Sequence, residues 1–169
     1  MDTPAAEPPV AEAIAVLERT PELLLALTRP LPVAWVDAPG DGDTWSPRDV
    51  VAHLLTTESP FVERITRMTE LDHPTLPAHD ERALLEAERA RPLYSLIEEL
   101  ARSRADHAQT MRALPAEAWT RTGQHQEVGP LTVAELVCHK AHHDLEHLAQ
   151  LAELLRAPFD AARGPMRAY

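Results

Sequence analysis

The 169-residue chain is predicted to fold as an all-α four-helix bundle with short extra helical segments in its loops. Apolar residues recur at helical spacing in four long stretches, prolines and glycines separate these stretches, and no run of five or more residues shows strand-like alternation. The length suits one domain, so we expect residues 1–169 to form a single domain, with residues 1–8 flexible and residues 159–169 as a C-terminal tail.

The first helix is expected from about Pro9 to Leu27, because apolar residues recur there every three or four positions. Pro21 lies inside this stretch and predicts a kink or a restart. Residues 30–42 are rich in proline and glycine and are therefore expected to form a loop.

The second helix has a strong start signal. Ser46 can cap it, Pro47 suits the first helical position, and Asp49 adds an acid beside the positive end of the helix dipole. An apolar stripe continues to Met68, and Pro60 predicts a kink on the way.

The third and fourth helices follow after a loop near residue 74. The third helical region spans roughly residues 80–113 and is expected to break or bend at Pro92. The last helix opens at Thr132, because the glutamate three residues later completes a capping box. We expect this helix to run to about Arg156 and to stop at Pro158.

Composition excludes several classes of protein. The net charge is −11 and the basic residues form no stripe, so we expect no nucleic-acid partner. The longest apolar run, Leu23 to Leu27, is far too short to span a membrane. The first residues resemble no secretory signal, which predicts a cytoplasmic protein, and the single cysteine, Cys138, excludes an intrachain disulfide and a cysteine-rich zinc module.

Histidine is the unusual residue, with nine in the chain and a cluster near its end. His139, His143 and His147 are spaced four residues apart and form a row along one side of the last helix. The whole row cannot hold one ion, since its ends are about 12 Å apart along the helix axis. His143 and His147 flank the apolar stripe most closely, so we predict these two as metal ligands, with His139 as a substitute or an outer group.

A third ligand is expected from another helix, and His53 is the best candidate because it lies at the edge of the second helix's apolar stripe. Three neutral imidazoles with an open coordination position are typical of a catalytic site, where a divalent ion activates water or holds a thiolate. A different interpretation stays open at this point: a lone histidine at a helix edge is usually structural, and the row from His139 to His147 could be a polar face of the bundle.

Some other polar residues have two interpretations each. Asp144 could orient a metal ligand or form a hydrogen bond or salt bridge to another helix, and Gln150, one turn beyond His147, has the same status. Glu58 and His125 could serve as acid or base groups at the mouth of a site, but nothing in their spacing requires this, and a surface role is expected for each.

Three motifs stand out along the chain: Trp45-Ser46-Pro47 followed by His53-Leu54, then Thr132-Val133 with Glu135-Leu136, and finally His143-Asp144 with His147-Leu148 and Gln150. Together they resemble the DinB superfamily, the DinB/YfiT-like metalloenzymes, and the resemblance covers nearly the whole chain. The resemblance implies a DinB/YfiT-like four-helix bundle, often a homodimer, with a metal triad of one histidine on the second helix and a pair on the last. By motif, this triad is His53, His143 and His147.

The resemblance also implies a class of function. Characterised members of the superfamily resemble thiol S-transferases or isomerases that use low-molecular-weight thiols, so the preferred expectation is metal-dependent thiol transfer to an electrophilic small molecule. The alternatives are a metal-dependent hydrolase and a non-catalytic, stress-associated metal-binding bundle. Zinc or nickel is the expected ion, with iron or manganese as further options.

Overall fold

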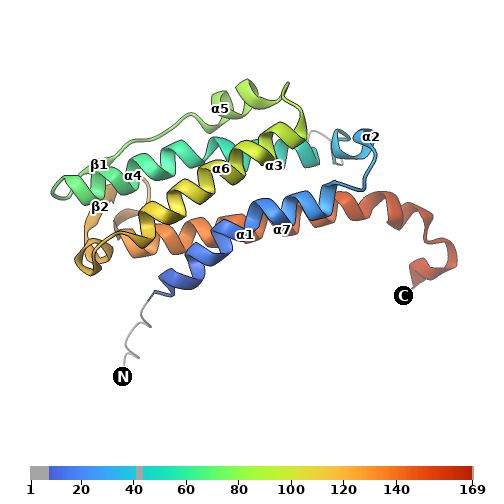
Figure 1. The fold of residues 1–169 in the computed structure, drawn as a ribbon. Helices are drawn as coiled ribbons and strands as arrows, with labels where there is room; N and C mark the ends of the chain where they lie inside the picture. Colours follow the sequence, from blue (N-terminus) through green and yellow to red (C-terminus); the bar gives the residue numbers. More distant parts are fainter. Residues whose placement is uncertain (1–7, 41–43, 169) are drawn as a thin grey trace.

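Four helical rods packed lengthwise form the protein, whose computed structural model describes residues 8–40 and 44–168 (Figure 1). The rods are α1 (Val10–Thr28), the consecutive pair α3 (Pro47–Thr56) and α4 (Glu58–Glu70), α6 (Leu93–Arg112) and α7 (Val133–Ala162). Both α1 and the α3–α4 rod pack against α6 and α7. α1 and the α3–α4 rod therefore lie diagonally opposite each other in the bundle. The predicted four-helix bundle is thus confirmed, while the expectation for residues 1–7 lies outside the described residues.

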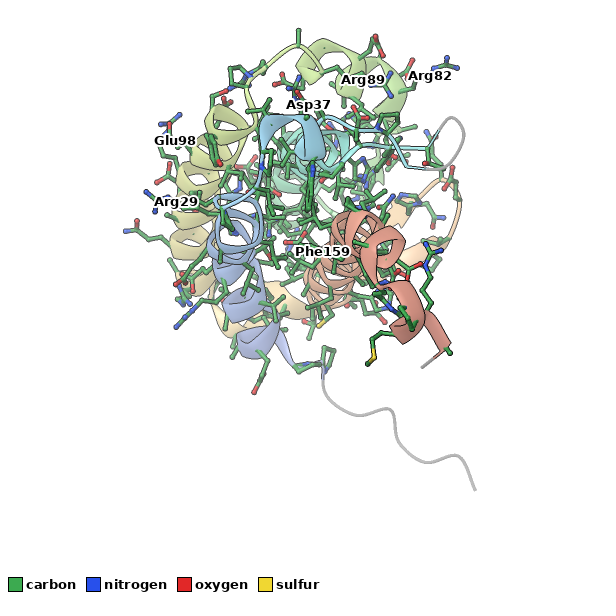
Figure 2. The ribbon with its side chains drawn as sticks, turned by 90° about the vertical axis from the view of Figure 1, so that its right-hand side faces the viewer. Arg29, Asp37, Arg82, Arg89, Glu98 and Phe159 are labelled. Atoms are coloured by element: carbon green, nitrogen blue, oxygen red, sulfur yellow. The ribbon has the colours of Figure 1, made fainter. Side chains whose placement is uncertain are left out.

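Short helical segments occupy the connections, as expected. They are α2 (Val33–Val36), α5 (Glu81–Glu88), η1 (Ala116–Thr120) and η2 (Gly164–Ala168). α5 packs against α3, and Figure 2 shows its Arg82 and Arg89 at the periphery of the bundle, far from Arg29 and Glu98 on the side formed by α1 and α6. No helix among the described residues is both long enough and apolar enough to cross a bilayer.

A small sheet closes one end of the bundle and was not expected from the sequence. Its strands are β1 (Thr75–Leu76), β2 (Thr122–His125) and β3 (Gly129–Thr132), in the order β1-β2-β3. β1 runs parallel to β2, and β2 pairs with β3 in an antiparallel hairpin. Strands of two to four residues are too short to show a periodic pattern, so the sheet could not be predicted from hydrophobic periodicity.

The predicted helix starts are present with their caps. The Ser46 side chain accepts a hydrogen bond from the backbone N–H of Asp49, and the Thr132 side chain accepts one from the N–H of Glu135. The predicted kink at Pro60 is wrong in position, since the rod breaks at Thr57. Pro60 lies in the first turn of α4, where a missing N–H costs no helical hydrogen bond.

Two prolines lie inside continuous helices. α7 runs through Pro158 to Ala162, so the predicted stop at Arg156 is wrong. The lost hydrogen bond falls near the end of the helix, where Phe159 packs edge-on against Trp35 with ring centroids 5.2 Å apart. α1 likewise continues through Pro21 without a restart.

The core has two apolar clusters separated by a polar layer. One cluster joins the C-terminal half of α1 to α3 and α6, and the other joins the N-terminal half of α1 to α4 and the start of α7. Between them lie the buried charged side chains of Glu58, Arg104, Lys140 and Asp144. Arg104 also donates a hydrogen bond to the carbonyl of Leu17 at 3.4 Å. This carbonyl has no helical donor, because Pro21, four residues later, has no N–H.

Candidate metal centre

The structure brings together three imidazoles from two rods of the bundle. His53 lies on α3, and His143 and His147 lie one turn apart on α7. One nitrogen from each ring lies within 4.8 Å of the other two, and Nε2 of His53 is 3.0 Å from Nε2 of His143. Among residues 8–40 and 44–168, no other group of three or more His, Cys, Asp or Glu side chains converges in this way.

Neighbouring side chains orient these rings. Nδ1 of His147 is 2.8 Å from Oε1 of Gln150, so this nitrogen donates a hydrogen bond and Nε2 is left with a free lone pair. Trp45 covers the group from one side, with its ring centroid 4.7 Å from that of His53 and 5.8 Å from that of His147. Two of the three rings are therefore held in place from outside the group.

Burial keeps the rings of His53 and His147 neutral. Loss of water around His53, which is 5% exposed, together with the nearby rings of His147 and His143, lowers its pKa to about 3. Burial also lowers the pKa of His147. Neutral imidazole is the form that binds a metal ion, so proton competition at this group is weak near neutral pH.

The donor set fits a divalent ion of the zinc type. With Zn–N bonds of about 2.0–2.1 Å, two ligands of one tetrahedral ion lie about 3.3 Å apart. The 3.0 Å separation between His53 and His143 is close to that value, so a shift of a few tenths of an ångström allows both to reach one ion. Three histidines would leave a fourth position for water or substrate.

His139 does not join this group. Its side chain is exposed, its ring centroid is 6.4 Å from that of His143, and burial of part of the ring lowers its pKa. His125 is half-buried in the hairpin. The expected surface role for Glu58 is wrong, since this residue is only 3% exposed. The break at Thr57 lies directly before it, so the stripe of α3 alone did not reveal its position.

The polar layer adjoins the triad through Asp144. Its Oδ2 lies 2.9 Å from Nη1 of Arg104, and its Oδ1 lies 3.9 Å from Nδ1 of His143. Asp144 therefore forms the interhelical salt bridge and also lies beside a predicted ligand. Burial opposes ionisation of this carboxyl, but His143, Arg104 and Lys140 together lower its pKa well below the ordinary value.

The sequence interpretation missed the other charged members of this layer. Nε of Arg104 lies 2.8 Å from Oε2 of Glu58, and Nζ of Lys140 lies 3.3 Å from Oε1 of Glu58. Burial lowers the pKa of Lys140, although Glu58 opposes this shift. One signal was available: Lys140 is the only lysine in the chain and lies one turn before His143.

Cavities reach the triad from two directions. One of about 940 Å³ is lined by Trp45, His53 and residues of α5. A smaller one of about 90 Å³ touches His143, His139 and Lys140. A substrate could therefore approach the candidate site from either cavity.

Comparison with known proteins gives a family and a fold. The family model of the DinB superfamily matches residues 16–151, whereas no curated protein matches the chain in sequence. YfiT from Bacillus subtilis, described as a probable metal-dependent hydrolase with an unusual four-helix bundle topology, is similar in structure, with a TM-score of 0.83, 20% identity and 93% of each chain covered.

A second similar structure is a histidine-to-alanine variant of the mycothiol-dependent maleylpyruvate isomerase. The TM-score is 0.69 at 10% identity, over 85% of this chain. Only 60% of the isomerase chain is covered, so the isomerase contains a substantial part without a counterpart here.

Proposed function

The chain belongs to the DinB superfamily, and from this premise we propose that His53, His143 and His147 bind one divalent metal ion in an enzyme that acts on small molecules. The convergence of three imidazoles within 4.8 Å, from helices far apart in sequence, is the observation that carries the proposal. Zinc or nickel is the favoured ion, because both accept imidazole ligands.

Thiol transfer to an electrophile is the preferred reaction. A divalent ion at the triad supplies Lewis acidity, which favours deprotonation of a thiol or of water near neutral pH. Gln150 and Trp45 hold His147 in place, and Trp45 also packs against His53. Neutral His139, at the edge of the small cavity, can accept a proton. The mycothiol dependence of the similar isomerase supports a thiol as one substrate.

Metal-dependent hydrolysis is the second candidate, and the description of YfiT supports it. It needs the same triad but no thiol. The homodimer and the cytoplasmic location expected from the sequence stay predictions.

Metal content tests the ligand set. Untagged protein purified without chelator should contain about one equivalent of divalent metal, whereas His143→Ala should contain much less. His142→Ala is the matched control, since the His142 side chain is 69% exposed on the same helix, where its Nδ1 lies 3.3 Å from Oε2 of Glu146. Equal metal content in the wild type and His143→Ala would refute the ligand set.

Activity then separates the reaction classes. Metal-loaded protein is incubated with an electrophile such as a haloarene, with and without mycothiol, bacillithiol or glutathione, and with a panel of esters and amides. Turnover that needs both metal and thiol supports transfer, and thiol-independent turnover supports hydrolysis. A metal-loaded protein that is inactive in every assay but loses stability on chelation would favour the non-catalytic alternative.

A further inference from the structure

Two neighbouring cavities lie beside α7 and form what we call the side cleft. The larger, of about 530 Å³, lies between the β2–β3 hairpin, residues 76–81 and α7. The smaller, of about 90 Å³, reaches His143 of the triad. Both have the same five residues in their walls: Arg64, His79, Glu81, Leu136 and His139. The two cavities therefore adjoin each other between the hairpin and the candidate metal centre.

Arg64 lines both parts of the side cleft, whereas Lys140 lines only the smaller one and lies 3.3 Å from Glu58. Nη2 of Arg64 donates a hydrogen bond to the carbonyl of Pro77 at 3.2 Å, and its Nε is buried without a hydrogen-bond partner. Within the part of the chain that the structure describes, no carboxylate lies within 4.0 Å of its guanidinium. Arg67, by contrast, lies 3.9 Å from Glu63 and lines neither cavity. Arg64 thus has donors available for an anionic ligand.

Apolar side chains form one part of the larger cavity's walls, where Leu76 and Leu136 are buried and Leu131 is half-buried. A hydrocarbon body of a ligand can pack against these three leucines. A planar guanidinium prefers to pair with a carboxylate through two parallel hydrogen bonds.

We propose that the side cleft binds a substrate with an apolar body and a carboxylate, and that Arg64 selects this substrate by pairing with the carboxylate. The inference rests on the proposed function, because the metal triad is what places the reactive part of the substrate beside His143. It adds the substrate class and a specificity residue to that function.

The acidic residues of the side cleft do not neutralise Arg64. Glu135 is held by its capping hydrogen bonds to Thr132. Glu127 is exposed and lines only the larger cavity, whereas Glu81 is exposed and lines both. Among the described residues none of these carboxylates lies within 4.0 Å of the Arg64 guanidinium, so Arg64 stays available to a ligand carboxylate.

Binding of hexanoate and its neutral analogue hexanamide tests the proposal without any activity assay. Full-length ¹⁵N-labelled protein with one equivalent of zinc is titrated with each compound, and amide chemical shifts give the dissociation constant and the location. We expect hexanoate to shift amides of residues 76–79 and 125–139 and to bind about tenfold more tightly than hexanamide, as for a hydrogen bond to a charged group.

Variants assign the preference to one residue. Arg64→Gln should weaken hexanoate binding about tenfold and leave hexanamide unchanged, whereas Arg67→Gln should bind both compounds like the wild type. Arg64→Lys should keep part of the preference for hexanoate over hexanamide, because the positive charge remains but the two parallel N–H donors of the guanidinium are lost.

Several results would overturn the proposal. One is equal affinity for hexanoate in Arg64→Gln and the wild type. This equality is what coordination of the carboxylate by zinc, without Arg64, would produce. Equal affinity of the wild type for the two compounds would also overturn it, and this comparison needs no folded variant. Failure of the proposed function is seen separately, as no uptake of zinc, and the same titrations then decide the role of Arg64 in the metal-free protein.

Discussion

Replacing Glu58 by glutamine should destabilise the protein strongly, because this carboxylate balances two buried cations. The side chains of Arg104, Lys140, Glu58 and Asp144 are 2%, 6%, 4% and 0% exposed, and their charges sum to zero when all are ionised. Glu58→Gln keeps the shape of the side chain but leaves two cations with one carboxylate. Water cannot compensate for the lost charge at these exposures.

The expected loss is about 3–5 kcal/mol in the free energy of unfolding, as for removal of one partner from a buried ion pair. For a chain of this size, this corresponds to a fall in Tm of about 6–20 °C. Urea unfolding followed by circular dichroism measures the loss, with the m-value as a check on two-state behaviour. Glu153→Gln is the control: it removes an ion pair with Arg156 whose side chains are 67% and 64% exposed, and it should cost at most about 1 kcal/mol.

A double variant tests the charge balance itself. Glu58→Gln combined with Lys140→Met removes one anion and one cation. The double variant should therefore lose less free energy of unfolding than the two single variants lose in sum. A free energy of unfolding for Glu58→Gln within 1 kcal/mol of the wild-type value, at an unchanged m-value, would refute this role of Glu58.

Three further results are expected. Gln150→Leu should weaken zinc binding about 10–100-fold in a chelator competition, because His147 loses the acceptor that fixes its tautomer; unchanged affinity would contradict this. Metal-free protein should lose stability as the pH falls from 6.5 toward about 3, because in that window the unfolded chain protonates His53 and the folded chain does not; a urea midpoint that rises on acidification would be the opposite result. Thr132→Ala should cost about 1 kcal/mol in urea unfolding by removing the cap of α7, and Thr120→Ala, whose exposed hydroxyl donates to the Glu117 carbonyl, is the comparison.

Local sequence patterns determined the helices and the candidate ligands. Ser46 and Thr132 mark helix starts because capping depends on residues within one turn, and the structure shows both caps. The pairing of His143 with His147 follows from the helical repeat, which fixes residues four apart on one face. These features need no information from distant parts of the chain, so the sequence by itself was sufficient for them.

Only the tertiary structure decided what lies between the helices. The 3.0 Å separation of His53 and His143 depends on how α3 packs against α7, and no periodicity within either helix encodes that distance. The burial of Glu58 and the free donors of Arg64 likewise depend on the break at Thr57 and on the segment around Pro77. A hydrophobic pattern determines which side of a helix is buried. Charged pairs and clefts form only where side chains from several helices pack together, which no single helix encodes.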